Sequence, residues 1–154
     1  MALKGIYVLA VLVSRDITVE VGSLGRLLFK RGFYAYVGSA QNSLGKRLER
    51  HVWKMAKRKF WHIDHLLSVG AARVVGVFTK EAEKREECNT AQSLARLGFP
   101  VGGFGCSDCR CKSHLFMFNS YSVLEKACLE LGFKPLPVSH CTGKHLKPGV
   151  FPFS

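Results

Sequence analysis

The sequence lacks any apolar run that could cross a membrane, and it is poor in acidic residues. No stretch of about 18 consecutive apolar residues occurs, so no transmembrane helix is expected. The apolar residues 8–13 are not followed by a small-residue cleavage site, so no secretory signal is expected either. We therefore expect an intracellular, cytoplasmic protein that has no membrane partner.

The shortage of acidic residues leaves a strong positive charge. The chain has 11 Asp and Glu residues against 23 Lys and Arg residues, which gives a formal net charge of +12. A field of this sign attracts polyanions, and nucleic acid is the commonest polyanion inside cells. The alternative is a basic protein whose charges are merely solvated.

The length and composition suit one globular domain. The 154 residues can bury a core, and 47% of them are apolar. No internal repeat and no linker-like segment is present, so we expect a single domain over residues 1–154. Proline gathers after residue 133 in a stretch without periodicity, so residues 133–154 are expected to form an irregular tail.

Apolar patterning predicts both strands and helices. Alternating residues on either side of a glycine turn predict a hairpin over residues 17–29. Short apolar, β-branched runs predict core strands over residues 4–13, 33–38, 72–78 and 114–118. Apolar residues at helical spacing predict helices over residues 43–55, 61–69, 83–97 and 121–131.

Two of the expected core strands carry tyrosines that could share one face of a sheet. Tyr7 lies on the same strand face as Leu9, and Tyr36 lies on the same face as Tyr34 and Gly38. If these strands pair, both phenols project to one side. Simple packing of the two rings in the core is the alternative.

The helix expected after the second of these strands has a basic edge. Arg47 and His51 stand four residues apart and therefore share one helix face. This face borders the apolar stripe and leans toward the sheet. Lys54 extends the same line, whereas Arg50 points further into solvent. A solvated basic face is again the alternative.

Three ordered motifs carry a resemblance to a known family. Gly5-Ile6-Tyr7 is followed by Tyr36-Val37-Gly38-Ser39-Ala40 and then by Lys46-Arg47-Leu48-Glu49-Arg50-His51. In order and spacing, these motifs resemble the GIY-YIG nuclease superfamily, and the chain as a whole resembles a small single-domain branch of it. The resemblance implies an α/β fold of the α+β type, with a small, mainly antiparallel sheet flanked by helices.

The resemblance also implies a metal-dependent endonuclease that hydrolyses phosphodiester bonds in DNA. Tyr7, Tyr36 and Arg47 match the family residues around the scissile phosphate, and His51 matches one subset of members. One divalent cation, Mg²⁺ or Mn²⁺, would be held by a helix glutamate. A guanidinium suits the charge that the phosphate oxygens gain during attack, and a hard cation suits the leaving oxygen.

Position selects Glu87 as this glutamate and metal ligand. It shares the inward face of its expected helix with Ala91 and Leu94. A carboxylate there is costly unless it is paired or bound to a metal. An ion pair with Lys84 or Arg85 is the alternative.

Further lysines and arginines are candidates for contact with nucleic acid, and two histidines are candidate metal ligands. His62 and His65 stand three residues apart and could share a metal, although hydrogen-bonded histidines are the alternative. The bases expected to contact nucleic acid, in addition to Arg47, are Arg50, Lys54, Lys57, Arg58 and Lys59.

A cysteine-rich loop is a candidate zinc site. Four donors occur within nine positions, although buried thiols in a tight loop are the alternative. The donors in the loop are Cys106, Cys109, Cys111 and His114, and Cys88, His140 and Cys141 could complete a site in space. Two other functions therefore stay open: a non-catalytic nucleic-acid-binding module of the same fold, and a zinc-stabilised interaction domain.

Overall fold

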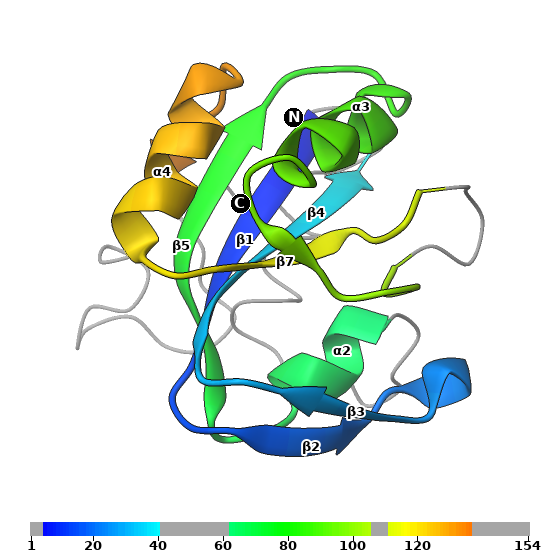
Figure 1. The fold of residues 1–154 in the computed structure, drawn as a ribbon. Helices are drawn as coiled ribbons and strands as arrows, with labels where there is room; N and C mark the ends of the chain where they lie inside the picture. The colour runs from blue at the N-terminus through cyan, green and yellow to red at the C-terminus, as the bar shows by residue number, and fades with distance from the viewer. Residues whose placement is uncertain (1–4, 41–61, 106–110, 137–154) are drawn as a thin grey trace, which may run out of the picture.

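The computed structural model describes residues 5–40, 62–105 and 111–136, and these form a sheet flanked by helices (Figure 1). The predicted α+β class, with a mainly antiparallel sheet, is confirmed. Within the described ranges, no helix combines the length and the apolarity needed to span a membrane.

The main sheet has six strands in the order β6-β7-β4-β1-β5-β8, and every pairing in it is antiparallel. β1 lies between β4 and β5, where both of its faces are covered, so its nearly continuous apolar sequence is the pattern that burial on two sides requires. The strands are β1 (Gly5–Val13), β4 (Gly32–Ala40), β5 (Ala72–Lys80), β6 (Phe99–Pro100), β7 (Leu115–Phe118) and β8 (Lys134–Leu136).

The predicted hairpin forms a separate two-stranded sheet. β2 (Ile17–Glu20) pairs with β3 (Arg26–Phe29), and a short 3-10 helix, η1 (Gly22–Leu24), joins them. Gly25 ends this turn at a φ of 77°, a backbone conformation that glycine adopts without a steric penalty. The hairpin lies next to α2 (His62–Leu67) and away from the other helices (Figure 1).

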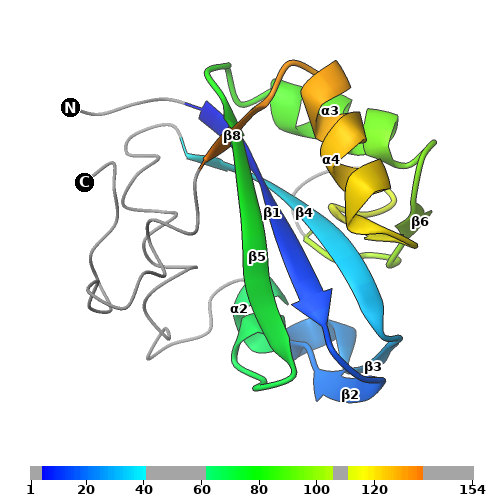
Figure 2. The same cartoon turned by 90° about the vertical axis from the view of Figure 1, so that its left-hand side faces the viewer.

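Three described helices cover the sheet from two sides. α3 (Glu86–Leu94) and α4 (Tyr121–Glu130) lie together on one face, and α2 lies on the other (Figure 2). Ser120 caps α4, because its hydroxyl accepts a hydrogen bond from the Val123 amide. α3 and α4 are shorter than their apolar patterns predict, because terminal residues of the predicted ranges form turns.

The two faces of the sheet build two separate cores. On β1, Tyr7 and Leu9 point into the core beneath α2, whereas Ile6 and Val8 point into the core beneath α3 and α4. Strand periodicity alone produces this division, because successive side chains alternate between the faces. Which face a residue occupies therefore decides which helices it can meet.

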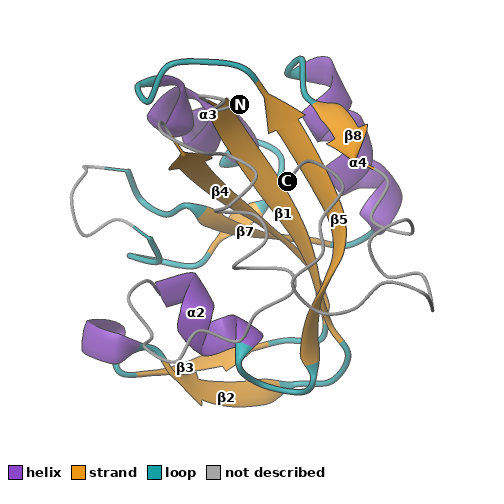
Figure 3. Ribbon diagram, turned by 180° about the vertical axis from the view of Figure 1, so that it is seen from behind, coloured by secondary structure: helices purple, strands orange, loops and turns teal. Residues whose placement is uncertain are grey.

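The C-terminal tail begins later than the sequence predicts. Residues 134–136 form β8, which pairs with β5 at one edge of the sheet (Figure 3). The expectation of irregular structure from residue 133 is therefore wrong for this short segment. Pro135 is tolerated because an edge strand leaves one side of its backbone without a ladder partner.

Candidate functional site

The two motif tyrosines lie on the same face of neighbouring strands, as predicted. In the pairing of β1 with β4, Tyr7 stands opposite Gly38, and Tyr36 stands opposite Leu9. The tyrosine ring centroids are 6.4 Å apart and the ring planes are tilted by 49°. Tyr7 is 1% exposed and Tyr36 is 7% exposed, so both rings are also part of the core beneath α2.

Gly38 is the residue that allows Tyr7 to take this position. A Cβ atom on Gly38 would lie within 2.8 Å of Tyr7 Cε1 and would overlap Cζ and the hydroxyl oxygen more severely. The Tyr7 ring therefore lies flat across the place where any other residue would carry a side chain. This contact explains on steric grounds why the second motif has glycine at position 38.

A chain of aromatic rings continues from Tyr36 to α2. The rings of Tyr36 and Phe104 have centroids 6.1 Å apart, and those of Phe104 and His62 are 5.6 Å apart. Nδ1 of His62 accepts a hydrogen bond of 2.8 Å from the backbone N–H of Gly105. His62 thus takes the hydrogen-bonded role that was the alternative to a metal pair with His65.

The partial burial of His62 predicts a pH-dependent stability. Burial, followed by the charge of His65, lowers the pKa of His62 below its usual 6.5. A lowered pKa means that the stabilising contribution is present above pH 6.5 and is lost as the pH falls. We expect His62→Asn, whose side-chain oxygen can still accept from Gly105, to flatten the decline in unfolding free energy below pH 6.5. The difference should be small because His62 is only partly buried and solvent screens its charge, and urea unfolding at several pH values measures it.

Glu87 reaches the second motif from α3. Its Oε1 accepts a 2.9 Å hydrogen bond from the Ser39 hydroxyl, and its Oε2 lies 3.0 Å from Nδ1 of His114. The side chain is 18% exposed, as its predicted inward position requires. Neither Lys84 nor Arg85 is its main partner, because Arg85 pairs with Glu83 at 3.1 Å and Lys84 acts only through its charge.

These contacts keep Glu87 ionised. Burial would raise its pKa, but the bonds with His114 and then Ser39, together with the charges of His114 and Lys84, bring the pKa below the usual 4.5. The stabilisation by this carboxylate is therefore present above pH 4.5 and is lost as the pH falls below it. Near neutral pH the group is a negative ligand.

The tyrosines and Glu87 approach β4 from opposite sides. Strand alternation puts Ser39 on the face of Val37, which packs beneath α3 and α4. Tyr7 and Tyr36 lie on the α2 face. Glu87 therefore meets the second motif through Ser39, near the end of β4.

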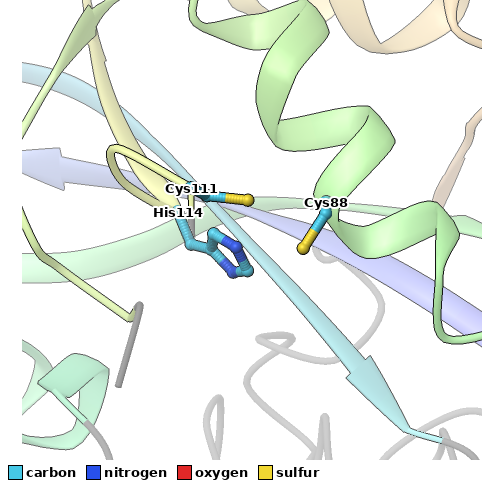
Figure 4. Close-up of side chains that lie close together, drawn as sticks. All are labelled: Cys88, Cys111 and His114. Carbon is cyan, nitrogen blue, oxygen red and sulfur yellow. The ribbon is translucent and has the colours of Figure 1, made fainter. Parts of the chain in front are cut away.

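A thiol–imidazole cluster (Cys88, Cys111 and His114) lies beside Glu87. The sulfur atoms and one imidazole nitrogen are all within 4.8 Å of one another. Cys88 comes from α3, and the other two residues come from the segment that leads into β7 (Figure 4). The sequence singled out Cys111 and His114, but it gave Cys88 only as one of several residues that could complete a site.

Several predicted site residues lie outside the described residues. The predicted catalytic residues among them are Arg47 and His51. The predicted nucleic-acid contacts are Arg50, Lys54, Lys57, Arg58 and Lys59. The remaining zinc candidates are Cys106, Cys109, His140 and Cys141. Their roles stay predictions.

Comparison with known proteins gave one match, to a family model. The model is described as a domain of unknown function, DUF123, and it matches residues 6–134. A comparison with curated proteins found no match, and a comparison with solved structures found none either. The matched segment contains every strand and helix described above except the ends of β1 and β8.

Proposed function

The chain belongs to the DUF123 family, and we propose that it is a divalent-cation-dependent endonuclease of the GIY-YIG type that cleaves DNA. The observation that carries this proposal is the hydrogen bond between Glu87 and Ser39. The carboxylate selected from the helix pattern reaches the second tyrosine motif although 48 positions separate the two residues. An ionised carboxylate beside that motif is what a cation-dependent reaction at this site needs.

Glu87 retains room for a cation. An ionised carboxylate has about four acceptor positions, and the contacts with Ser39 and His114 use two of them. Mg²⁺ and Mn²⁺ are commonly held by one or two carboxylates together with water. Glu87 would hold one such ion, which would supply positive charge for the leaving oxygen.

Tyr7, Tyr36, Arg47 and His51 have the other roles in this proposal. A phenol beside a cation and a guanidinium loses its proton more readily, so it can accept the proton of an attacking water. Arg47 would stabilise the charge on the non-bridging phosphate oxygens. His51 would assist proton transfer, and the excess of basic residues would hold the DNA backbone.

A cleavage assay tests this proposal. The protein is incubated with labelled branched, duplex and single-stranded DNA in the presence of Mg²⁺ or Mn²⁺. We expect nicking of at least one substrate by the wild-type chain and loss of nicking in the Arg47→Ala, Glu87→Ala double variant. Cleavage that persists in the double variant would contradict the proposed endonuclease site.

A second candidate is a nucleic-acid-binding module that has the same fold but no turnover. The burial of Tyr7, at 1% exposure, favours it, because a buried phenol cannot touch a phosphate without rearrangement. So does the approach of Glu87 from the opposite face of the sheet. This candidate requires binding without cleavage under either divalent ion.

Both candidates predict binding that depends on salt and on the basic segment after residue 55. Each lysine or arginine that contacts a phosphate increases the magnitude of the negative slope of log K against log salt by about 0.9 for duplex DNA. Replacing Lys57, Arg58 and Lys59 by alanine is expected to reduce the slope by about 2 to 3. A matched variant that loses the exposed Arg15, Lys126 and Lys134 should retain most of the slope. Equal losses in the two variants would contradict a localised interface.

A further inference from the structure

We propose that Cys88, Cys111 and His114 bind a zinc ion and that Glu87 orients His114 for this role. The site joins α3 to the segment that leads into β7, and its three metal ligands differ from the ligand proposed for the cleavage cation, although Glu87 contacts His114. It does not depend on nuclease activity, because its argument uses only contacts within the described residues.

The separations of the three donor atoms suit zinc. In a tetrahedral site with zinc–sulfur bonds of about 2.3 Å, two sulfurs lie about 3.8 Å apart. The donor atoms of Cys88, Cys111 and His114 lie within 4.8 Å of one another, so closure needs movements of about 1 Å. Cysteine side chains rotate about a single χ angle, and such movements need no change in the backbone.

His114 is held in place for metal binding. Its side chain is 2% exposed, and its backbone is fixed on both sides: its N–H donates to Phe104 at 2.8 Å and its carbonyl accepts from Val37 at 2.9 Å. Nδ1 faces Oε2 of Glu87 at 3.0 Å. In the proposed site, Nδ1 keeps this contact with Glu87, and Nε2 would be the zinc ligand.

The contact with Glu87 completes a known chemical arrangement. Histidines that bind metals usually direct their other ring nitrogen to a carboxylate or a carbonyl, which fixes the tautomer and the ring orientation. The Glu87 carboxylate is itself held in place, because its Oε1 accepts a 2.9 Å hydrogen bond from the Ser39 hydroxyl. Carboxylate, imidazole and metal would thus form one continuous line from β4 to the zinc.

The donor set selects the class of metal. Two thiolates and an imidazole are soft and borderline ligands, which favour zinc over the oxygen-seeking Mg²⁺, Mn²⁺ and Ca²⁺. Cys88 and Cys111 are both thiols rather than halves of a disulfide, and each is only partly buried, as a metal needs for entry. Three protein ligands leave the fourth tetrahedral position for water or another donor.

The thiol of Cys128 provides an internal comparison. It is fully buried on α4 in the apolar core beneath α3 and α4, and burial raises its pKa to about 12. Among the described residues, it does not belong to any group of three potential ligands. Cys128 therefore serves as the control cysteine in the experiments below.

Metal content and cobalt spectroscopy test the site without reference to cleavage. We expect the full chain, purified under reducing conditions, to contain about one zinc ion per molecule in this four-coordinate type of site. Replacement by Co²⁺ should give the absorption of a tetrahedral ion together with a thiolate charge-transfer band. Both signals should be lost in Cys88→Ser and Cys111→Ser and retained in Cys128→Ala. Zinc affinity that is unchanged in Cys88→Ser and Cys111→Ser would overturn the proposal.

Thiol protection tests the site in the wild-type chain, so the result does not depend on a variant that folds. Zinc should slow the alkylation of Cys88 and Cys111 by iodoacetamide, and peptide mass spectrometry after removal of zinc with a chelator should show both residues modified. Equal alkylation with and without zinc would contradict the site.

Glu87→Gln separates the zinc proposal from the proposed function. If Glu87 orients His114, the variant should bind zinc about 10- to 100-fold more weakly and should still saturate. Loss of cleavage with unchanged zinc affinity would support the nuclease and overturn the positioning role. Weaker zinc binding in a protein that cleaves no substrate would support the zinc site alone.

Discussion

Gly38→Ala is expected to destabilise the protein by about 1 to 3 kcal/mol, the usual cost of forcing an extra group into a filled core. The new methyl group would overlap the Tyr7 ring, which cannot withdraw because the side chain is 1% exposed and packed beneath α2. Either the ring or β4 must move, so the tyrosine pair loses its arrangement. Urea unfolding of the variant measures the loss.

Two comparisons show whether the overlap is the cause. Gly70 and Gly102 have no heavy atom within 4 Å of the place where a Cβ would stand, so alanine at either position should change stability by less than about 0.5 kcal/mol. In a double-mutant cycle, Tyr7→Ala should cost less when Gly38 is already alanine. Additive effects of the two substitutions would show that the ring and the glycine do not interact.

Glu87→Gln is expected to lower the cleavage rate about a thousandfold, which corresponds to about 4 kcal/mol in the activation free energy. Glutamine has the shape of glutamate and can still accept from Ser39, but it lacks the charge that holds a divalent cation. Single-turnover cleavage at saturating Mn²⁺ measures the effect. Circular dichroism and thermal unfolding establish that the variant is folded.

Glu86→Gln is the matched control for this variant. Glu86 is the neighbouring residue on α3, and its Oε2 accepts a 2.8 Å hydrogen bond from Asn89 in an exposed position. The substitution removes the same charge from the same turn of helix without touching Ser39 or His114. We expect near wild-type cleavage, and an equal loss in both variants would mean that the net charge of α3, rather than Glu87 itself, matters.

The local geometry of the tyrosine motifs could be predicted from sequence because strand periodicity determines it. Alternation puts Tyr7 and Tyr36 on one face once their strands pair, and the observed register pairs them. Helical periodicity likewise predicts the inward position of Glu87. The same alternation places Ser39 on the opposite face from the tyrosines. The motif alone does not indicate that Ser39 contacts Glu87 there.

The thiol–imidazole cluster could not be predicted from local pattern. Cys88 and Cys111 are 23 positions apart, and only the packing of α3 beside the segment leading into β7 brings them together. The available signal was the position of Cys88, directly after the inward Glu87.

β8 was not predicted for another reason, because three edge residues that include Pro135 carry no alternating pattern.

The most direct test of the proposed function is manganese-dependent cleavage by the zinc-loaded wild-type chain. Labelled branched and duplex DNA are mixed with protein across a titration of Mn²⁺, and nicked product is quantified on denaturing gels. The proposed endonuclease predicts nicking that rises and saturates with Mn²⁺, and that falls about a thousandfold in Glu87→Gln. Salt-sensitive binding of the same DNA with no nicked product at any Mn²⁺ concentration would contradict it.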